Sequence, residues 1–188
     1  HRKTVEMKKL LPAFALMLSA SAFGFVSDWN GIKIAPEKTW LQTAEKKYFG
    51  NIHIDPRAKA DLVKLEIKDG KFVIDVREFF RENPATEVTV RIPLNGVVPG
   101  KKARLTVEMS SVPATPFELF FEGQNVVDGK GEHFWKARKC NAKESAQKFE
   151  IEELLPATVK DVRLRLTFRA PAVYTVGACD FLPEVPAK

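Results

Sequence analysis

The chain has 188 residues, with 30 Lys and Arg against 24 Asp and Glu, and only two cysteines. At about 100–200 residues per domain, this length fits one domain with short appendages. A hydrophobic content of 45% excludes a wholly disordered chain, and two cysteines exclude both a disulfide-dense scaffold and a four-cysteine zinc site. The formal charge of +6 raises the question of a nucleic-acid partner.

The N-terminal residues have the pattern of a secretory signal peptide. Met7-Lys8-Lys9 is a basic start, residues 10–18 are an apolar stretch, and Ala20-Ser21-Ala22 is a small-residue cleavage site. The stretch is shorter than the about 20 residues that a membrane-spanning helix needs, so no transmembrane segment is expected. We therefore expect residues 1–22 to be upstream residues plus a signal peptide, and the protein to be secreted, periplasmic or extracellular. The alternative is a buried N-terminal helix.

This segment carries half of the net charge. Without its four basic residues and one acidic residue, 26 basic and 23 acidic side chains remain, a net charge of +3. The remainder has no run of five or more Lys and Arg. No nucleic-acid partner is therefore expected.

From residue 23 onward, short segments that alternate apolar and polar residues dominate. Such alternation is typical of strands with one buried face, and Asp-Gly at 69–70 and at 128–129 signals turns. The predicted strands cover, in chain order, 62–67, 71–79, 88–92, 103–109, 117–122, 133–139, 149–151, 162–168 and 173–182. Residues 37–47 and 142–147 have room for a helical turn or two. The pattern predicts an all-β, antiparallel β-sandwich or barrel.

The order of four motifs resembles a known family. Asn30-Gly31 precedes Trp40, a hairpin covers 69–76, a Pro-Gly turn and strand cover 98–107, and closing strands cover 154–181. This order is similar to that of jelly-roll carbohydrate-binding modules with a galactose-binding-like fold, which are common on secreted bacterial polysaccharide-degrading enzymes. The resemblance implies a jelly roll over 23–183 with a tail over 184–188. It also implies non-catalytic binding of a polysaccharide or oligosaccharide, and we expect a monomer.

Catalytic motifs are scarce in the sequence. His53 and His133 are the only histidines after residue 22, and neither has a second ligand at metal-site spacing. Glu118 and Glu122 share a strand face, but lie about 13 Å apart at ~3.3 Å per residue, wider than glycoside hydrolysis requires. We expect a protein that is not an enzyme. The alternative function is a structural or protein-interaction β-sandwich that packs on a partner protein.

Aromatic side chains are the first candidates for sugar binding, because sugar C–H faces stack on flat rings. His133 and Trp135 lie on one face of a predicted strand and Phe134 lies on the other. If Phe134 packs inward, Trp135 forms an exposed stacking platform. In the alternative, Trp135 is a core residue and Phe134 is exposed. Tyr48 is a further candidate ring.

Polar candidates complete the predicted glycan site. Gln124 and Asn125, at an expected loop, have amides that donate and accept hydrogen bonds, although ordinary turn chemistry explains them equally well. Arg165 belongs to a set of outward arginines that either lines a groove for an acidic glycan or is simply solvated. The other members are Arg91, Arg104 and Arg163.

Two further predictions concern stabilisation. In an oxidising compartment Cys140 and Cys179 are expected to pair, closing a loop that contributes roughly 4 kcal/mol in the chain-entropy model. The alternative is two buried free thiols. The resemblance also implies a structural calcium between the first and last strands, with Asp180 and Asp28 as its ligands.

Overall fold

The computed structural model describes residues 29, 32–34, 40–42, 48–51, 53–94 and 96–186. Most of the described chain is strand. In chain order the elements are β1 Lys33–Ile34, β2 Trp40–Gln42, β3 Tyr48–Asn51, β4 His53–Asp55, the 3-10 helix η1 Arg57–Leu62, β5 Lys64–Lys68, β6 Lys71–Asp75, α1 Arg77–Glu82, β7 Val88–Pro93, β8 Lys102–Val112, β9 Thr115–Val127, β10 Lys130–Ala142, β11 Gln147–Leu154, β12 Val159–Phe168 and β13 Val173–Leu182.

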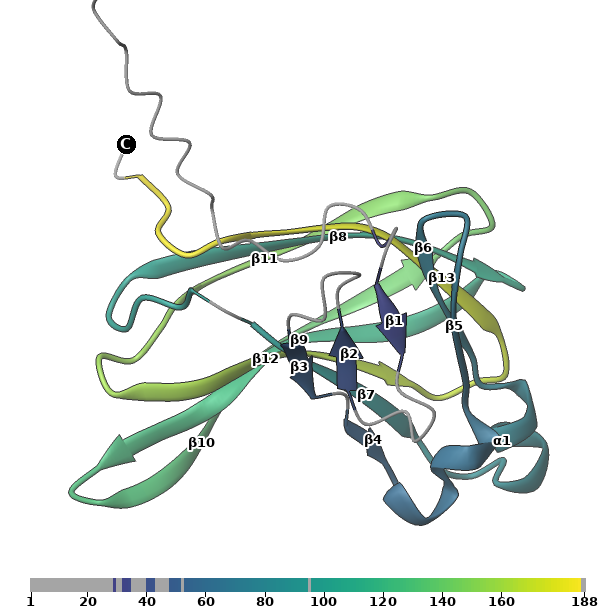
Figure 1. The fold of residues 1–188 in the computed structure, drawn as a ribbon, viewed down its shortest axis with the longest axis horizontal. Coiled ribbons are helices and arrows are strands. Elements are labelled where there is room, and N and C mark those ends of the chain that lie inside the picture. Colours follow the sequence, from purple (N-terminus) through teal and green to yellow (C-terminus); the bar gives the residue numbers. More distant parts are fainter. Residues whose placement is uncertain are drawn as a thin grey trace, which may run out of the picture.

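Two five-stranded antiparallel sheets face each other (Figure 1). One has the order β10-β9-β12-β7-β4, and we call it the front sheet. The other has the order β11-β8-β13-β6-β5, and we call it the back sheet. A small sheet, β1-β2-β3, completes the described strands. The predicted all-β antiparallel sandwich is confirmed.

The strand predictions need three corrections. The predicted strand 71–79 ends at Asp75, and α1 begins at Arg77, whose backbone N–H and guanidinium both bond the Asp75 carboxylate. The turns expected at 37–47 and 142–147 are not helical in the described residues, since 40–42 form β2 and β10 runs to Ala142. Gln124 and Asn125 lie in β9 and not in a loop.

The β9–β10 hairpin turns at Asp128-Gly129, as the turn signal in the sequence predicts. Both residues have positive φ, 49° and 75°, as a type I′ hairpin turn requires. The two strands pair without interruption, from Val127 opposite Lys130 to Thr115 opposite Ala142. They therefore extend several residues beyond the predicted strands on both sides of the turn. In Figure 1 this hairpin extends toward the lower left.

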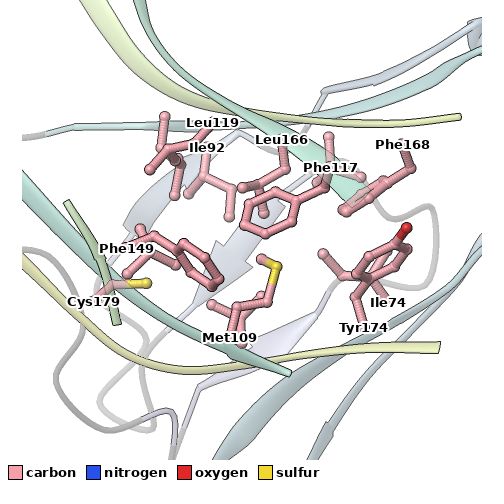
Figure 2. Close-up of a cluster of buried hydrophobic side chains, with 14 of the residues drawn as sticks. Ile74, Ile92, Met109, Phe117, Leu119, Phe149, Leu166, Phe168, Tyr174 and Cys179 are labelled. Carbon is pink, nitrogen blue, oxygen red and sulfur yellow. The ribbon is translucent and has the colours of Figure 1, made fainter. Parts of the chain in front are cut away.

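The core lies between the two sheets. Figure 2 shows Leu119, Ile92 and Leu166 of the front sheet facing Met109 and Phe149 of the back sheet. All five side chains are buried, and Phe149 is the most exposed of them at 9%. Alternation in the sequence assigns four of the five to a buried strand face, and the structure confirms that assignment.

Trp29 is also a core residue. It has 0% exposure, its Nε1–H donates to the Gly177 carbonyl oxygen at 2.7 Å, and its ring stacks on Phe72 with 4.9 Å between centroids. This indole ties the start of the described chain to the back sheet. It is unavailable for ligand stacking.

The predicted disulfide is absent, because Cys140 and Cys179 are both free and buried. Cys140 lies at the edge of the front sheet opposite Phe117, whereas Cys179 lies in the back sheet opposite Val107. Burial raises the pKa of the Cys140 thiol to about 11, and burial, with the nearby Asp180 and Glu108 carboxylates, raises the pKa of Cys179 well above its usual range. The alternative of two buried thiols describes this structure.

Only one of the two predicted calcium ligands lies within the described residues. Asp180 is exposed on β13 opposite Thr106, and Asp28 lies outside the described residues. In the described ranges, no three His, Cys, Asp or Glu side chains group as a metal site. The described carboxylates therefore do not form a calcium site by themselves, and the calcium stays a prediction. No helix within the described ranges is long and apolar enough to span a bilayer.

Candidate functional site

The outer face of the front sheet carries the candidate site. Side chains alternate along β9, so Phe117, Leu119 and Phe121 enter the core while Phe120 and Glu122 face outward. Strand register then brings residues from neighbouring strands beside them. Trp135 and Arg163 flank Glu122, and Ala137 and Arg165 flank Phe120.

Trp135 is the most prominent side chain of this face. It is 58% exposed, whereas Phe134 is half-buried and packs against the core. Beneath Trp135 lies Phe120, with 6.1 Å between ring centroids and only 7% exposure. Of the two orientations considered from the sequence, the structure has the one with Trp135 outward.

Arg165 packs on the other side of Phe120. Its guanidinium carbon lies 4.4 Å from the Phe120 ring centroid, a cation–π geometry. Its Nε–H donates to the Thr167 hydroxyl at 3.0 Å. Trp135, Phe120 and Arg165 therefore form a continuous layer across β10, β9 and β12, with the indole at the edge strand.

Glu122 is a buried carboxylate at the centre of the same face. Its side chain is 7% exposed, and it accepts hydrogen bonds from Arg91 Nε at 2.5 Å and from Arg165 Nη1 at 3.3 Å. His133 Nε2 lies 3.7 Å from Glu122 Oε2. One side chain of β9 thus ties together β7, β12 and β10.

Further ion pairs surround this centre. Arg91 also bonds the Asp55 carboxylate of β4. Arg169, just after β12, has its Nη2 atom 2.6 Å from Glu87 Oε2 and 3.3 Å from Glu118 Oε2. The positive and negative groups of this face therefore largely compensate one another.

A small pocket of about 80 Å³ lies at the end of the face that is nearest to the β9–β10 turn. Its polar lining offers both hydrogen-bond donors and acceptors. The lining residues are Glu122, Gly123, Gln124, His133, Asp161 and Arg163. A bulge in β12 between Lys160 and Arg163 shapes the pocket, and Gly123 allows the bulge to come close, because a Cβ there would lie 3.1 Å from the Lys160 carbonyl oxygen.

A second hollow, of about 390 Å³, lies at the opposite end of β9 and β10. Lys139, Asn141, Glu118 and Arg169 are its main polar lining. From His133 to Lys139 the face runs about 20 Å, at ~3.3 Å per residue. Trp135 lies between the two hollows, so the face has the form of an extended surface and not of a single deep cavity.

The structure gathers three of the four polar or aromatic candidates of the β9–β10 region. Trp135, His133 and Gln124 share the outer face, and Gln124 pairs with His133 across the hairpin. Asn125 is separate, because it faces the opposite side of β9 and contacts the Thr158 hydroxyl.

Of the other candidates from the sequence, three arginines lie in the front sheet, whereas Tyr48 and Arg104 lie in other sheets. Tyr48 pairs with Gln42 in the small sheet, and its side chain lies outside the described residues. Arg165 and Arg91 are on the front sheet, as is Arg163. Arg104 is in the back sheet, where it bonds Glu152.

Sequence reasoning missed Phe120 and Glu122 as parts of the site. The sequence suggests Glu122 only as a catalytic carboxylate, and Phe120 only as part of a strand. Phe120, Glu122 and Gln124 are spaced two residues apart, and residues with this spacing in a strand lie on one face. This spacing could have placed Phe120 and Glu122 beside Gln124. What the sequence lacked was the strand order that brings Arg91 and Arg165 to them.

His53 lies at the β4 edge of the face, opposite Arg91. Its pKa is lowered from 6.5 first by desolvation and then by the positive charge of Arg163, with smaller effects from Arg91 and Arg57; Asp55 acts in the opposite direction. The imidazole is therefore neutral at neutral pH.

No protein-family model and no curated protein matches the chain. Solved structures do. A Clostridium thermocellum endo-1,4-β-D-xylanase 10B structure, its CBM22-1 and GH10 modules complexed with xylohexaose, aligns with 88% of this chain and 30% of its own, at 10% identity and TM-score 0.53. The family 29 carbohydrate-binding module CBM29_1 of Piromyces equi aligns over 84% and 89%, at 12% identity and TM-score 0.49.

A third similar structure is the CBM22-1 xylan-binding domain of a Paenibacillus barcinonensis xylanase, covering 66% of this chain and 82% of its own at 11% identity and TM-score 0.47. At such identities a likeness defines the fold only. Together with the two facing sheets, the alignment at TM-score 0.53 shows that this chain has a jelly-roll β-sandwich fold like that of carbohydrate-binding modules.

Proposed function

We propose that this protein is a secreted, non-catalytic glycan-binding module, and that its ligand lies on the outer face of the front sheet. The observation that carries the proposal is Trp135, a flat ring 58% exposed on that face and supported from below by Phe120. An exposed indole held in place is suited to stacking on the C–H face of a sugar ring.

The surroundings of Trp135 support the same proposal. His133, Gln124, Arg163 and Asp161 line the adjacent pocket and provide both donors and acceptors for sugar hydroxyls. The face is open over about 20 Å of strand, which suits a chain of sugars more than a single buried one. Weak binding is expected, because a shallow surface leaves much of a ligand solvated.

Non-catalytic binding agrees with the chemistry of the central carboxylate. The oxygens of Glu122 already accept hydrogen bonds from Arg91 and Arg165, so this carboxylate holds neighbouring strands of the front sheet together. Secretion is proposed on the signal-peptide pattern of residues 7–22.

The test is affinity electrophoresis of the protein through gels that contain neutral or acidic polysaccharides. We expect retardation by at least one of them, and a loss of affinity of about tenfold, 1.4 kcal/mol, in Trp135→Ala. The matched control is Leu154→Ala, which removes another exposed apolar side chain, 63% exposed, from the back sheet. Absence of retardation across a broad panel, or equal binding by Trp135→Ala, would refute the proposal.

A further inference from the structure

We propose that Glu122 makes this face selective for uncharged stretches of glycan, by occupying the two central arginines that would otherwise bind a sugar carboxylate or sulfate. This inference rests on the proposed glycan-binding function. It argues against one of the two alternatives left open by the sequence, in which the outward arginines line a groove for an acidic glycan.

The first step is that both arginines already donate hydrogen bonds to acceptors of the protein itself. Arg91 bonds Glu122 through Nε at 2.5 Å and also bonds Asp55 and the Thr89 hydroxyl. Its side chain is 17% exposed. Little of this guanidinium is left to form the bidentate contact by which arginine recognises a carboxylate or a sulfate.

Arg165 is occupied in the same way. It bonds Glu122 at 3.3 Å and Thr167 at 3.0 Å, and Glu87 Oε1 lies 3.7 Å from its Nη2. With 16% of its side chain exposed, and its guanidinium over the Phe120 ring, it presents little free charge to a ligand.

The second step concerns Arg163, which lines the pocket beside Trp135 and has no ion pair within the described part of the chain. Its pocket also contains Glu122 and Asp161, and neither forms an ion pair with it. An anionic sugar group in this pocket would meet one guanidinium and two carboxylates, which removes the electrostatic gain. A hydroxyl, by contrast, donates to a carboxylate and accepts from a guanidinium.

The third step is that the exposed lysines on this face, as opposed to Lys136 on the other side of β10, lie away from the indole. Lys139 is four residues along β10 from Trp135 and stands opposite Glu118, while Lys160 is beyond the pocket opposite Gln124. Charges so exposed are screened by salt within about 10 Å at 0.1 M. The centre of the face is therefore charge-compensated.

The experiment compares one polysaccharide in two charge states, so that the backbone of the ligand stays constant. A neutral polysaccharide that retards the protein is used as such and after carboxymethylation, each at low and at high salt. Wild-type protein is expected to bind the neutral form with little dependence on salt, and the carboxymethylated form at least about tenfold more weakly.

Glu122→Gln tests the residue itself. The amide keeps the shape of the side chain but removes its negative charge and one acceptor oxygen, which leaves the charges of Arg91 and Arg165 less compensated and open to an added anion. We expect it to gain about tenfold in affinity for the carboxymethylated polysaccharide, and high salt to abolish the gain. Glu150→Gln is the matched control, because it gives the molecule the same change in net charge at an Arg104 ion pair on the back sheet.

The outcomes are distinct. If no polysaccharide binds, the proposed function and this inference both fail. If wild-type protein prefers the carboxymethylated form, or if Glu122→Gln folds and gains nothing over Glu150→Gln, the inference fails while glycan binding stands. Should Glu122→Gln not fold, the preference and salt dependence of the wild-type protein still decide the selectivity.

Discussion

At the scale of single residues, the candidate site depends on two side chains that are almost fully buried. Phe120 supports the exposed indole, and Glu122 fixes the arginines beside it. A buried carboxylate is costly unless it is paired, and here two guanidinium groups offset that cost. The exposed indole that we propose as the sugar contact is thus held by neighbours that are themselves fixed by strand register.

The electrostatics of the face can be measured at His53. Its lowered pKa means that, as pH falls through 6.5, the unfolded chain takes up the proton before the folded protein does. The free energy of unfolding therefore falls as pH drops through 6.5, because the unfolded chain binds the proton more tightly than the folded protein. Well above pH 6.5 the imidazole is neutral in both states, and His53 has no effect on the pH dependence of stability.

An NMR titration of the His53 ring should give a midpoint below 6.5. Part of the shift comes from Arg163, so Arg163→Gln should raise the midpoint, and Arg104→Gln on the back sheet should leave it in place. A midpoint at or above 6.5 would contradict the combination of burial and positive charge at this edge of the face.

At the scale of elements, the β9–β10 hairpin presents the site. Its two central turn residues adopt positive φ, and its strands remain paired along their full length. Gly129 has a φ of 75°, and apart from its two chain neighbours no residue comes within 4 Å of the position that a Cβ would take. A side chain at position 129 would therefore meet no steric clash, and its cost would come from the left-handed backbone conformation alone.

Gly129→Ala should destabilise the protein by about 1 kcal/mol, because alanine disfavours the left-handed region. Gly131→Ala, in the strand beside it, lacks positive φ and would place its Cβ 3.6 Å from Gln124 Oε1, an ordinary contact. Urea unfolding should show the loss in the first variant and little change in the second. Equal effects would argue against the type I′ turn.

The elements were easier to predict than their assembly. Alternation located β8 and β12, because each has one face in the core, and Asp128-Gly129 marked the hairpin turn. Alternation could not decide which side of β10 faces solvent, since both parities of residues 133–135 include an aromatic ring. The packing of Phe134 against the core, together with the pairing of β10 with β9, decides which side of β10 is exposed.

At the scale of the whole molecule, the two sheets have different roles. The inner faces bury the core, and the outer face of the front sheet is left to carry the aromatic and charged layer. In the described residues the two sheets are held together by the core side chains packed between them, without a disulfide. Neither the strand order nor the Glu122 network follows from local sequence, because both depend on residues far apart in the chain, 31 positions for Arg91 and Glu122.

The central claim is that the glycan contacts Trp135, and the indole N–H resonances test it most directly. On titration with a polysaccharide fragment that binds, the Trp135 indole signal should move saturably. The Trp29 signal should stay fixed, because that indole is buried and bonded to the Gly177 carbonyl. A bound protein whose Trp135 signal does not move would contradict the account.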